Sequence, residues 1–277
     1  MKLPSLKVVL LTPLVAFTLF YLLGAVLIAN RGNPTLETVA SPAKALEIAI
    51  FGASGTAGDG ILEAALASKD IGKIQVITRR ITPRMQAGIN SGKAEVTIHL
   101  DYLDYSSIVS KVADVDAVFW AIGISSLGAD EKTYGMIHVD FPTHFVKAWA
   151  PINQKPNPLF HFISSSDISE DSNTMWVREK IRAEESLFEF AEGSKLRVIA
   201  YRPDYIGPTK QQASLGQNLL YWFFKPVGAA VLATQIGQAM IDVSLREPLF
   251  ENGAKLSTGK IVQHAQAYLN QTNPERQ

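Results

Sequence analysis

Hydrophobic residues are arranged in two different ways along this chain. The 22 residues from Val8 to Ala29 include no charged side chain, whereas after residue 45 short apolar runs alternate with segments of helical periodicity. At about 1.5 Å per residue, the first run makes a helix of roughly 33 Å, which is enough to cross a bilayer core. It predicts an N-terminal transmembrane anchor within residues 1–30; a cleavable signal peptide and a buried helix are the alternatives.

The remainder of the chain reads as a linker followed by one domain. Residues 31–45 hold prolines and small polar residues without periodicity, which is typical of a linker. Apolar runs then predict strands at 46–51, 73–78, 94–99, 116–121, 159–164 and 196–201. Helical stretches are predicted at 131–149, 174–191, 217–224, 233–245 and 257–268, after a first helix that ends near Ala67. This alternation predicts a doubly wound parallel sheet, a three-layer Rossmann domain over residues 46–277 with a small C-terminal helical substrate lid.

Composition removes several classes of function. Among 277 residues, 26 basic and 26 acidic side chains balance, which argues against a protein that wraps nucleic acid. The chain has no cysteine, which excludes disulfides, thiolate zinc sites and iron–sulfur clusters. The five histidines have no ligand spacing with carboxylates, so we expect no metal.

A glycine-rich turn carries the strongest chemical signal. Gly52-Ala53-Ser54-Gly55-Thr56-Ala57-Gly58 directly follows the first strand and opens the first helix. In that context Gly52 allows the tight turn, Gly55 the close approach of a pyrophosphate, and Gly58 the packing of helix on strand. A flexible turn without function is the alternative. The motif predicts dinucleotide contacts at Gly52, Ser54, Gly55, Thr56, Ala57 and Gly58.

The spacing G-x-x-G-x-x-G resembles that of the extended and atypical short-chain dehydrogenase/reductase families. The similarity is greatest to the NmrA-like, Tat-interacting-protein-like members, and it extends from Leu46 to about Val243. The stretches IFGASGTAG, VFWAIG, HVDFPTHFVKA, HFISSSDIS, WVREK and RPDYIGP carry it. The resemblance implies an NAD(P)-binding oxidoreductase that acts on a small carbonyl or hydroxyl substrate.

The end of the second strand bears on the choice of cofactor. Arg79 and Arg80 stand where an NAD-selective site carries an acidic residue, and two guanidiniums suit a 2′-phosphate. We therefore favour NADP over NAD; a solvated basic pair is the alternative. The resemblance assigns further cofactor contacts to Asp101 at the adenine, and to Ala121, Gly123, Lys180 and Pro203.

The catalytic pattern of the family is incomplete here. Active members use a serine after the fifth strand to polarise the carbonyl, and a tyrosine with a lysine four residues later to transfer the proton. Ser165 is our candidate among Ser164, Ser165 and Ser166, and Lys180 is present. Trp176 occupies the tyrosine position, and an indole does not titrate in a useful range.

Three interpretations of Trp176 stay open. It is a core aromatic in a protein without chemistry, or it lines a site where water, Tyr134 or Tyr205 supplies the proton, or the helix register is misassigned. His138 stands where relatives often carry an asparagine that holds a water, and is a structural histidine or a proton relay.

Two functions follow from these observations. The first is a membrane-anchored NADP-dependent oxidoreductase; the second is a non-catalytic NADP-binding protein that senses redox state or acts as a scaffold. An extended-class epimerase is weakened because it too needs the tyrosine. We expect a small-molecule substrate, the membrane as a partner through the N-terminal helix, no nucleic acid, and an unidentified protein partner as an option. Use of a cytosolic nicotinamide pool favours a single-pass protein whose domain faces the cytoplasm.

Overall fold

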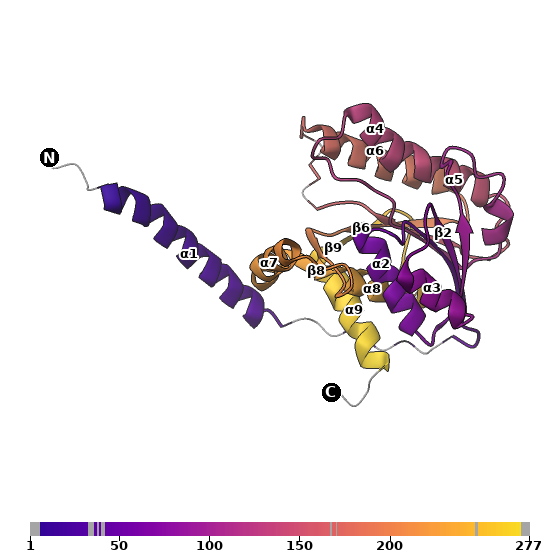
Figure 1. Ribbon diagram of the computed structural model, residues 1–277, viewed down its shortest axis with the longest axis horizontal. Coiled ribbons are helices and arrows are strands. Elements are labelled where there is room, and N and C mark those ends of the chain that lie inside the picture. Colours follow the sequence, from indigo (N-terminus) through magenta and orange to yellow (C-terminus); the bar gives the residue numbers. More distant parts are fainter. Residues whose placement is uncertain are drawn as a thin grey trace.

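A seven-stranded parallel sheet forms the centre of the domain (Figure 1). The computed structural model describes residues 6–32, 36–37, 39, 42–166, 168–169, 171–246 and 249–272, without the side chains of residues 6–11 and 13. The strand order is β3-β2-β1-β4-β5-β6-β9. The strands are β1 (Leu46–Phe51), β2 (Ile71–Thr78), β3 (Ala94–Ile98), β4 (Ala117–Trp120), β5 (Leu159–Ile163), β6 (Arg197–Arg202) and β9 (Ala254–Ser257). The order reverses between β1 and β4, where open α/β sheets bind their ligands.

Helices cover both faces of this sheet (Figure 1). On one face lie α2 (Thr56–Ala67), α3 (Pro83–Asn90), α8 (Ala233–Leu245) and α9 (Thr258–Thr272). On the other lie the short helix η1 (Val109–Val112), α4 (Glu131–Gly135), the π-helical segment η2 (Met136–Asp140), α5 (Phe141–Trp149) and α6 (Met175–Ala191). A second, two-stranded parallel sheet pairs β7 (Tyr205–Gly207) with β8 (Ala230–Leu232), and α7 (Leu215–Phe224) and η3 (Lys225–Val227) lie beside it.

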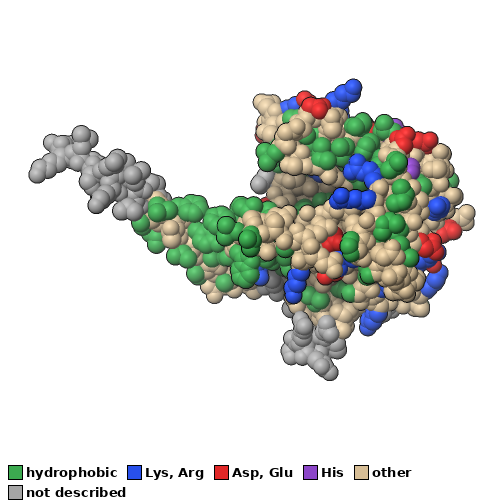
Figure 2. All heavy atoms as spheres, in the orientation of Figure 1, with side chains coloured by type: hydrophobic (Ala, Val, Ile, Leu, Met, Phe, Trp, Pro, Cys, Tyr) green, Lys and Arg blue, Asp and Glu red, His purple; other side chains and the backbone are tan. Residues whose placement is uncertain are grey.

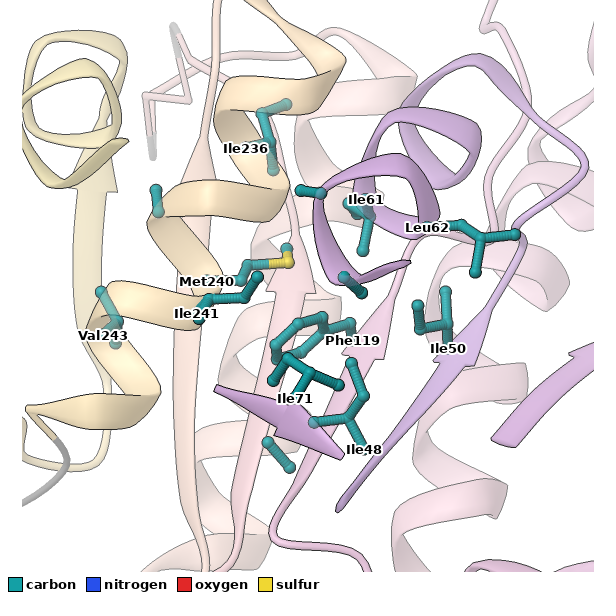
Figure 3. Close-up of a cluster of buried hydrophobic side chains, with 14 of the residues drawn as sticks. Ile48, Ile50, Ile61, Leu62, Ile71, Phe119, Ile236, Met240, Ile241 and Val243 are labelled. Carbon is teal, nitrogen blue, oxygen red and sulfur yellow. The ribbon is translucent and has the colours of Figure 1, made fainter. Parts of the chain in front are cut away.

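Alternate residues of the central strands supply two hydrophobic cores. Ile48 and Ile50 of β1 pack with Phe119 against α2 and α8, where Ile61 and Met240 meet them (Figure 3). Their neighbours Ala49 and Phe51 belong to the core on the opposite face, with α5 and α6. Because both faces of a strand are buried, the strand sequences are almost wholly apolar rather than alternating.

The six predicted strands are all present, within two residues of the predicted bounds. Missing from the prediction are α3, β7, β8 and β9. Strands β7 and β8 have three residues each, and the edge strand β9 is largely exposed with only Leu256 buried, so none shows a usable hydrophobic pattern.

The predicted helix 131–149 is divided into α4, η2 and α5. Pro142 stands in the first turn of α5 and has no backbone N–H to offer. The preceding turn widens to a π-helical segment that carries His138. Such single π turns inside helices are frequent at functional sites.

The prediction of an N-terminal transmembrane helix, and with it of single-pass membrane localisation with a cytoplasm-facing domain, is wrong. Within the part of the chain that the structure describes, no helix combines the length and the apolar character that a membrane crossing requires. The apolar run does form the helix α1 (Leu6–Asn30). Its lack of charge was therefore not sufficient evidence for a lipid environment.

One side of α1 makes contacts within the chain. The Tyr21 hydroxyl donates a hydrogen bond to the carbonyl oxygen of Phe223 at 2.8 Å, and the two rings stack 5.3 Å apart. A Cβ on Gly228 would lie 3.3 Å from the Ile28 side chain. Apolar side chains along α1 thus continue onto α7 at the edge of the domain (Figure 2). The division into residues 1–30, 31–45 and 46–277 stays a prediction, and residues 33–35, 38 and 40–41 of the linker lie outside the described residues.

Candidate cofactor and active site

A cavity of about 220 Å³ lies at the carboxyl ends of β1, β2 and β4, where the strand order reverses. It brings together seven of the predicted cofactor residues, which are Gly52, Ser54, Gly55, Arg79, Arg80, Ala121 and Gly123. Thr78, Tyr102, Ile122, Ile124, Ile137 and Phe141 complete the lining. A larger hollow of about 870 Å³ lies at the far end of α6, away from these residues.

The three glycines of the turn have different surroundings. Gly52 has a φ of +80°, and a Cβ there would lie 2.6 Å from the backbone of Ala121. A Cβ on Gly58 would lie 2.1 Å from the carbonyl oxygen of Gly52. On Gly55, in contrast, the nearest atom to a Cβ is 3.5 Å away. Gly52 and Gly58 are therefore needed for the turn to pack, whereas the space beside Gly55 is open to a ligand.

The N-cap of α2, Gly55, is part of the cavity lining, so the first backbone N–H groups of this helix lie beside the opening. Gly55 is the N-cap and has no side chain to satisfy them, so the positive end of the helix dipole is available to an anion. Asp59 lies in the first turn and would oppose an anion, but Arg84 binds its two oxygens at 2.8 and 3.1 Å. Thr209 donates a further hydrogen bond to Asp59. The carboxylate is thus neutralised within the protein.

Arg79 and Arg80 are exposed at the end of β2 and line the cavity beside Gly52 and Ser54. Neither guanidinium forms an ion pair with a carboxylate among the described residues. The Thr78 hydroxyl donates to the carbonyl oxygen of Arg80 at 2.9 Å, which fixes the backbone that carries them. Two unpaired cations at one mouth of the cavity can bind a phosphate with charge-assisted hydrogen bonds.

Asp101 lies outside the cavity lining, and its neighbour Tyr102 takes the position at the wall. The Asp101 carboxylate is exposed and accepts a hydrogen bond from the backbone of Leu103 at 3.0 Å. Tyr102 is buried and stacks on Phe141 with ring centroids 5.5 Å apart. Burial raises the pKa of the Tyr102 phenol to about 12. The sequence analysis did not predict that Tyr102 lines the cavity. It placed the cofactor contact one residue earlier, at Asp101.

The second part of the candidate site lies where β5 and β6 end. The backbone N–H of Ser164 donates to Tyr201 at 2.7 Å and that of Ser166 to Pro203 at 3.1 Å, so the serine run lies along the start of the R-P-D-Y-I-G-P turn. Ser165 is half-buried between them. The Ser164 hydroxyl is buried and has no partner in the described chain. This edge therefore brings the predicted Ser165 and Pro203 together, next to a buried serine hydroxyl that has no partner among the described residues.

Lys180 projects from α6 to the same place. Its Nζ donates to the carbonyl oxygen of Ile163 at 3.1 Å and lies 5.3 Å from the centre of the Phe162 ring. Glu184, one turn later, is paired with Arg202 at 2.9 Å, so it is not bonded to the lysine. Burial lowers the pKa of Lys180 to about 7, against a smaller opposing effect of Glu184. An ordinary lysine is fully charged at neutral pH, whereas this one can release its proton there.

His138 connects the two parts of the site. Its Nε2 lies 3.2 Å from both the backbone nitrogen and the carbonyl oxygen of Ile124, a residue of the cavity wall, while Nδ1 is buried without a partner. Burial, and then the charge of Lys180, lower the pKa of His138 to about 3. The imidazole is thus neutral at physiological pH. It packs against Tyr134 with ring centroids 4.1 Å apart.

The structure bears on the alternatives for the missing tyrosine. Trp176 and Lys180 both lie on α6, one turn apart, and the assignment of Trp176 to the tyrosine position stays a prediction. Burial raises the pKa of Tyr134 to about 12, with a smaller contribution from Glu179. The Tyr205 hydroxyl donates to the carbonyl oxygen of Gln217 at 3.0 Å. Neither tyrosine is therefore set up as an acid at neutral pH.

Several predicted residues lie outside the cavity lining. They are Thr56, Ala57, Gly58, Asp101, Ser165, Trp176, Lys180 and Pro203. Thr56, Ala57 and Gly58 form the first turn of α2 beside the cavity. Lys180 lies near enough to His138 for its charge to add to the effect of burial on the pKa of the histidine. The roles assigned to these side chains stay predictions. No group of three or more metal-ligating side chains occurs among the residues that the structure describes, and the expected absence of a metal stays a prediction too.

Comparison with known proteins gives distant relatives. No model of a known protein family matches the chain. It is 29 % identical over 175 residues to the Leucinostatins biosynthesis cluster protein T of Purpureocillium lilacinum, a match that covers 62 % of this chain and 61 % of that protein. It is 24 % identical over 217 residues to the mitochondrial protein fmp52 of Emericella nidulans, covering 77 % of this chain and 90 % of the relative.

Solved structures show the fold. An oxidoreductase of the short-chain dehydrogenase/reductase family from Burkholderia thailandensis superposes with a TM-score of 0.62 at 15 % identity, covering 79 % of this chain and 93 % of that one. The 3-oxoacyl-[acyl-carrier protein] reductase of Brucella melitensis, in complex with NAD, gives 0.60 at 13 % identity, with 80 % and 98 % covered. The chain has the Rossmann fold of the short-chain dehydrogenases/reductases, as its sequence predicted. The NmrA-like subtype stays a prediction.

Proposed function

We propose that this protein is an NADP-dependent oxidoreductase that acts on a small carbonyl or hydroxyl compound. The observation that carries the proposal is the joint lining of one cavity by the glycine turn after β1 and by Arg79 and Arg80 after β2. The fold of the solved neighbours, two of which are named a reductase and an oxidoreductase, supports it. A binding site for nicotinamide dinucleotide at this position of a doubly wound sheet follows the general rule for such folds.

The residues present fit this cofactor. The opening beside Gly55 admits a pyrophosphate to the uncapped N-terminus of α2, and the paired Asp59 does not repel it. The unpaired guanidiniums of Arg79 and Arg80 suit the 2′-phosphate that distinguishes NADP from NAD. When bound, the cofactor supplies or accepts a hydride.

The substrate would bind at the ends of β5 and β6. Ser165 would donate a hydrogen bond to the carbonyl oxygen and polarise it, with the free hydroxyl of Ser164 beside it. Lys180 and Pro203 adjoin the same position, and His138 links it to the cavity wall.

Trp176 favours a second candidate function, a non-catalytic NADP-binding protein that senses redox state or serves as a scaffold. An indole N–H can donate a hydrogen bond but cannot transfer a proton at neutral pH. Both functions require NADP binding, and only the first requires turnover. The leucinostatin-cluster relative is named for a biosynthetic cluster, which agrees better with an enzyme.

Binding of NADPH and NADH to single-site variants tests the cofactor proposal. We expect Arg79→Ala and Arg80→Ala each to weaken NADPH by about 10- to 100-fold, because a hydrogen bond to a charged group contributes about 1.5–3 kcal/mol. NADH affinity should change little. Lys69→Ala removes an exposed cation after α2 and is the matched control, which should leave both affinities unchanged. Equal loss of NADPH and NADH would contradict the 2′-phosphate assignment.

Turnover separates the two functions. Purified protein is incubated with NADPH and a panel of small aldehydes and ketones, and nicotinamide absorbance is followed. The oxidoreductase proposal predicts turnover that Ser165→Ala lowers at least about 10²-fold, which is typical for loss of one oxyanion donor. NADPH binding without turnover, together with activity gained in Trp176→Tyr, would support the non-catalytic function instead.

A further inference from the structure

Exposed apolar side chains are concentrated on two helices at one edge of the domain. Among the residues that the structure describes, nine large hydrophobic side chains on α1 and five on α7 are exposed, against nine in the rest of the chain. We call the exposed apolar side chains of α1 from Leu14 to Leu27 and of α7 from Leu215 to Phe223 the α1–α7 surface (Figure 2). Scattered exposed leucines are ordinary, whereas a contiguous apolar surface marks an interaction site.

One stripe of α1 already packs on the domain. Tyr21, Gly24, Ala25 and Ile28 are half-buried and lie on one side of the helix. The Tyr21 ring stacks on Phe223 of α7, and its hydroxyl donates to the Phe223 carbonyl oxygen at 2.8 Å. This stripe sets the position of α1 beside α7 (Figure 1). The other sides of α1 are therefore presented in a fixed place, which lowers the cost of binding a partner.

The side of α1 turned away from this stripe has the spacing of a helix-pairing seam. Val15, Leu19, Leu22 and Val26 follow one another at intervals of four, three and four residues, and they are 53–62 % exposed. Two helices pack along each other when apolar residues repeat in this way. We refer to these four residues as the α1 seam.

The helix α7 has a similar stripe. Leu215, Leu219 and Trp222 are separated by four and three residues, so they lie on one face of α7. They are 72–91 % exposed. Because Phe223 joins α7 to α1, the two stripes belong to one rigid unit at the edge of the domain.

The α1–α7 surface is large enough for a stable interface. Its fourteen large apolar side chains offer roughly 100 Å² each, or about 1,400 Å² together. A stable complex buries about 800 Å² on each partner, so little more than half of the surface is sufficient. The largest apolar patch of a typical monomer is about 300–600 Å². The surface thus exceeds what a monomer ordinarily leaves in water.

The chemistry of the surface fits a second copy of the chain. In a symmetric contact a surface meets itself, so a charge on it would meet a like charge. Residues 8–29 and α7 have no charged side chain. The polar side chains within residues 14–29 are Thr18 and Tyr21, and both donate to carbonyl oxygens of the same chain, at 2.9 and 2.8 Å. A copy packed on α1 would therefore leave no charge and no polar group of this segment unpaired.

We propose that the α1–α7 surface is the interface of a homodimer, in which the α1 seam of one copy packs on the α1 seam of the other. The partner is a second copy of this chain, and the contact is an apolar helix pair at the edge of both domains. This inference is independent of the proposed function, and its test needs no cofactor or substrate.

The first experiment measures the molar mass of the full-length protein. Light scattering is recorded after size exclusion at micromolar concentration in buffer without detergent. We expect about 60 kDa, twice the 30.2 kDa of one chain. The mass should not fall when NaCl is raised, because the charge-free surface contributes no ion pair that salt could screen.

The second experiment places charge in the α1 seam. Leu19→Glu combined with Val26→Glu should raise the dissociation constant of the dimer by at least about 10²-fold, because a buried unpaired carboxylate is costly. Both side chains face away from the stripe that packs on the domain, so far-UV circular dichroism and the thermal midpoint of the Rossmann domain should stay unchanged. Leu127→Glu is the matched control, since Leu127 is an 89 % exposed leucine outside the α1–α7 surface.

Cross-linking tests the same contact without adding charge. The chain has no cysteine, so a single introduced cysteine is the only thiol of each copy. The variants are Val15→Cys, Leu19→Cys, Leu22→Cys and Val26→Cys. On mild oxidation at least one of them should form covalent dimers, at the position where the two helices cross. Leu127→Cys should form none.

Each outcome decides for or against the dimer. A pair of chains that the double seam variant dissociates and a seam cysteine cross-links supports it, provided that Leu127→Glu stays dimeric. A monomeric wild type, or a dimer that survives the double seam variant, overturns it. Assemblies that keep growing with concentration would show non-specific association instead. A monomer that floats with phosphatidylcholine vesicles would identify lipid as the occupant and overturn the dimer.

Discussion

Gly123 and His138 are in direct contact: a Cβ added to Gly123 would lie 2.7 Å from Cε1 of the imidazole. Gly123 lines the proposed cofactor cavity, and the pKa of His138 is lowered by burial and, to a smaller extent, by the charge of Lys180. The two residues therefore connect the lining of the cavity with the part of the candidate site that holds Lys180. Because Gly123 has no side chain, the His138 ring has room to lie close to the backbone of Ile124, whose N–H is 3.2 Å from Nε2.

Gly123→Ala should disturb both parts of the site at once. The added methyl group must displace the His138 ring, and crowding of this kind in a packed site costs about 1–3 kcal/mol. We expect a lower free energy of unfolding in urea, weaker NADPH binding and lower turnover. Gly216→Ala is the control, because a Cβ there meets no atom within 4 Å. Unchanged stability and affinity in Gly123→Ala would show that the contact is unimportant.

Replacement of two glycines of the turn by alanine should affect different properties, stability at Gly58 and NADPH affinity at Gly55. A Cβ on Gly58 would lie 2.1 Å from a backbone oxygen, so Gly58→Ala should lower thermal stability strongly. A Cβ on Gly55 has room in the protein, so Gly55→Ala should keep its melting temperature. The same methyl group occupies the space proposed for the pyrophosphate, and NADPH affinity should fall at least about tenfold, a loss of 1.4 kcal/mol. Gly55→Ala with normal NADPH affinity would place the phosphates elsewhere.

The sequence predicted the central part of the fold because its strands are buried on both faces. Apolar runs such as Leu46–Phe51 are recognisable from composition alone. The helical segments between successive strands indicate that the strands pair in parallel, as they do in the structure. The three-residue strands β7 and β8 and the polar edge strand β9 carry no such pattern. The charge-free run at residues 8–29 was misread, because hydropathy alone does not tell which surroundings an apolar helix has.

For the candidate site, local motifs were more informative than distant contacts. The glycine turn and Arg79-Arg80 are defined by their positions after strands, and the structure brings them to one cavity. Burial of Lys180 and the neutral state of His138 depend on packing between α6, η2 and β5, which no local pattern encodes. Tyr102 was missed for the same reason, since its stacking partner Phe141 is distant in sequence.

Lys180 should make the free energy of unfolding increase with pH between about 7 and 10.5. Its pKa is about 7 in the folded state and near 10.5 when unfolded, so unfolding takes up a proton between these values. The free energy of unfolding should therefore rise with pH across this window, by at most about 1.4 kcal/mol per pH unit from this group. Lys180→Met should lose that slope in urea titrations, and Lys147→Met should keep it. The same slope in all three proteins would contradict a buried, neutral Lys180.

Two buried histidines should make the protein sensitive to acid. Burial lowers the pKa of both His138 and His161 to about 3, and His161 also bonds the Tyr201 hydroxyl at 2.9 Å. The unfolded chain binds protons on these groups below about pH 6.5, whereas the folded protein does not. Stability should fall as pH drops from 6.5 toward 3, and His138→Gln should flatten this decline. Replacement of the exposed His144 by Gln is the control that should leave it unchanged.

Binding of NADPH to the wild-type chain tests the central claim most directly. Energy transfer from tryptophan to the reduced nicotinamide is followed as NADPH is added to the full-length protein. The account predicts saturable binding with a Kd below about 1 mM, the upper end of the usual range of KM values. It also predicts competition by NADP⁺ and loss of affinity in Arg79→Ala but not in Lys69→Ala. An absence of saturable binding at millimolar NADPH would contradict the assignment of the glycine turn, and with it every step built on the cavity.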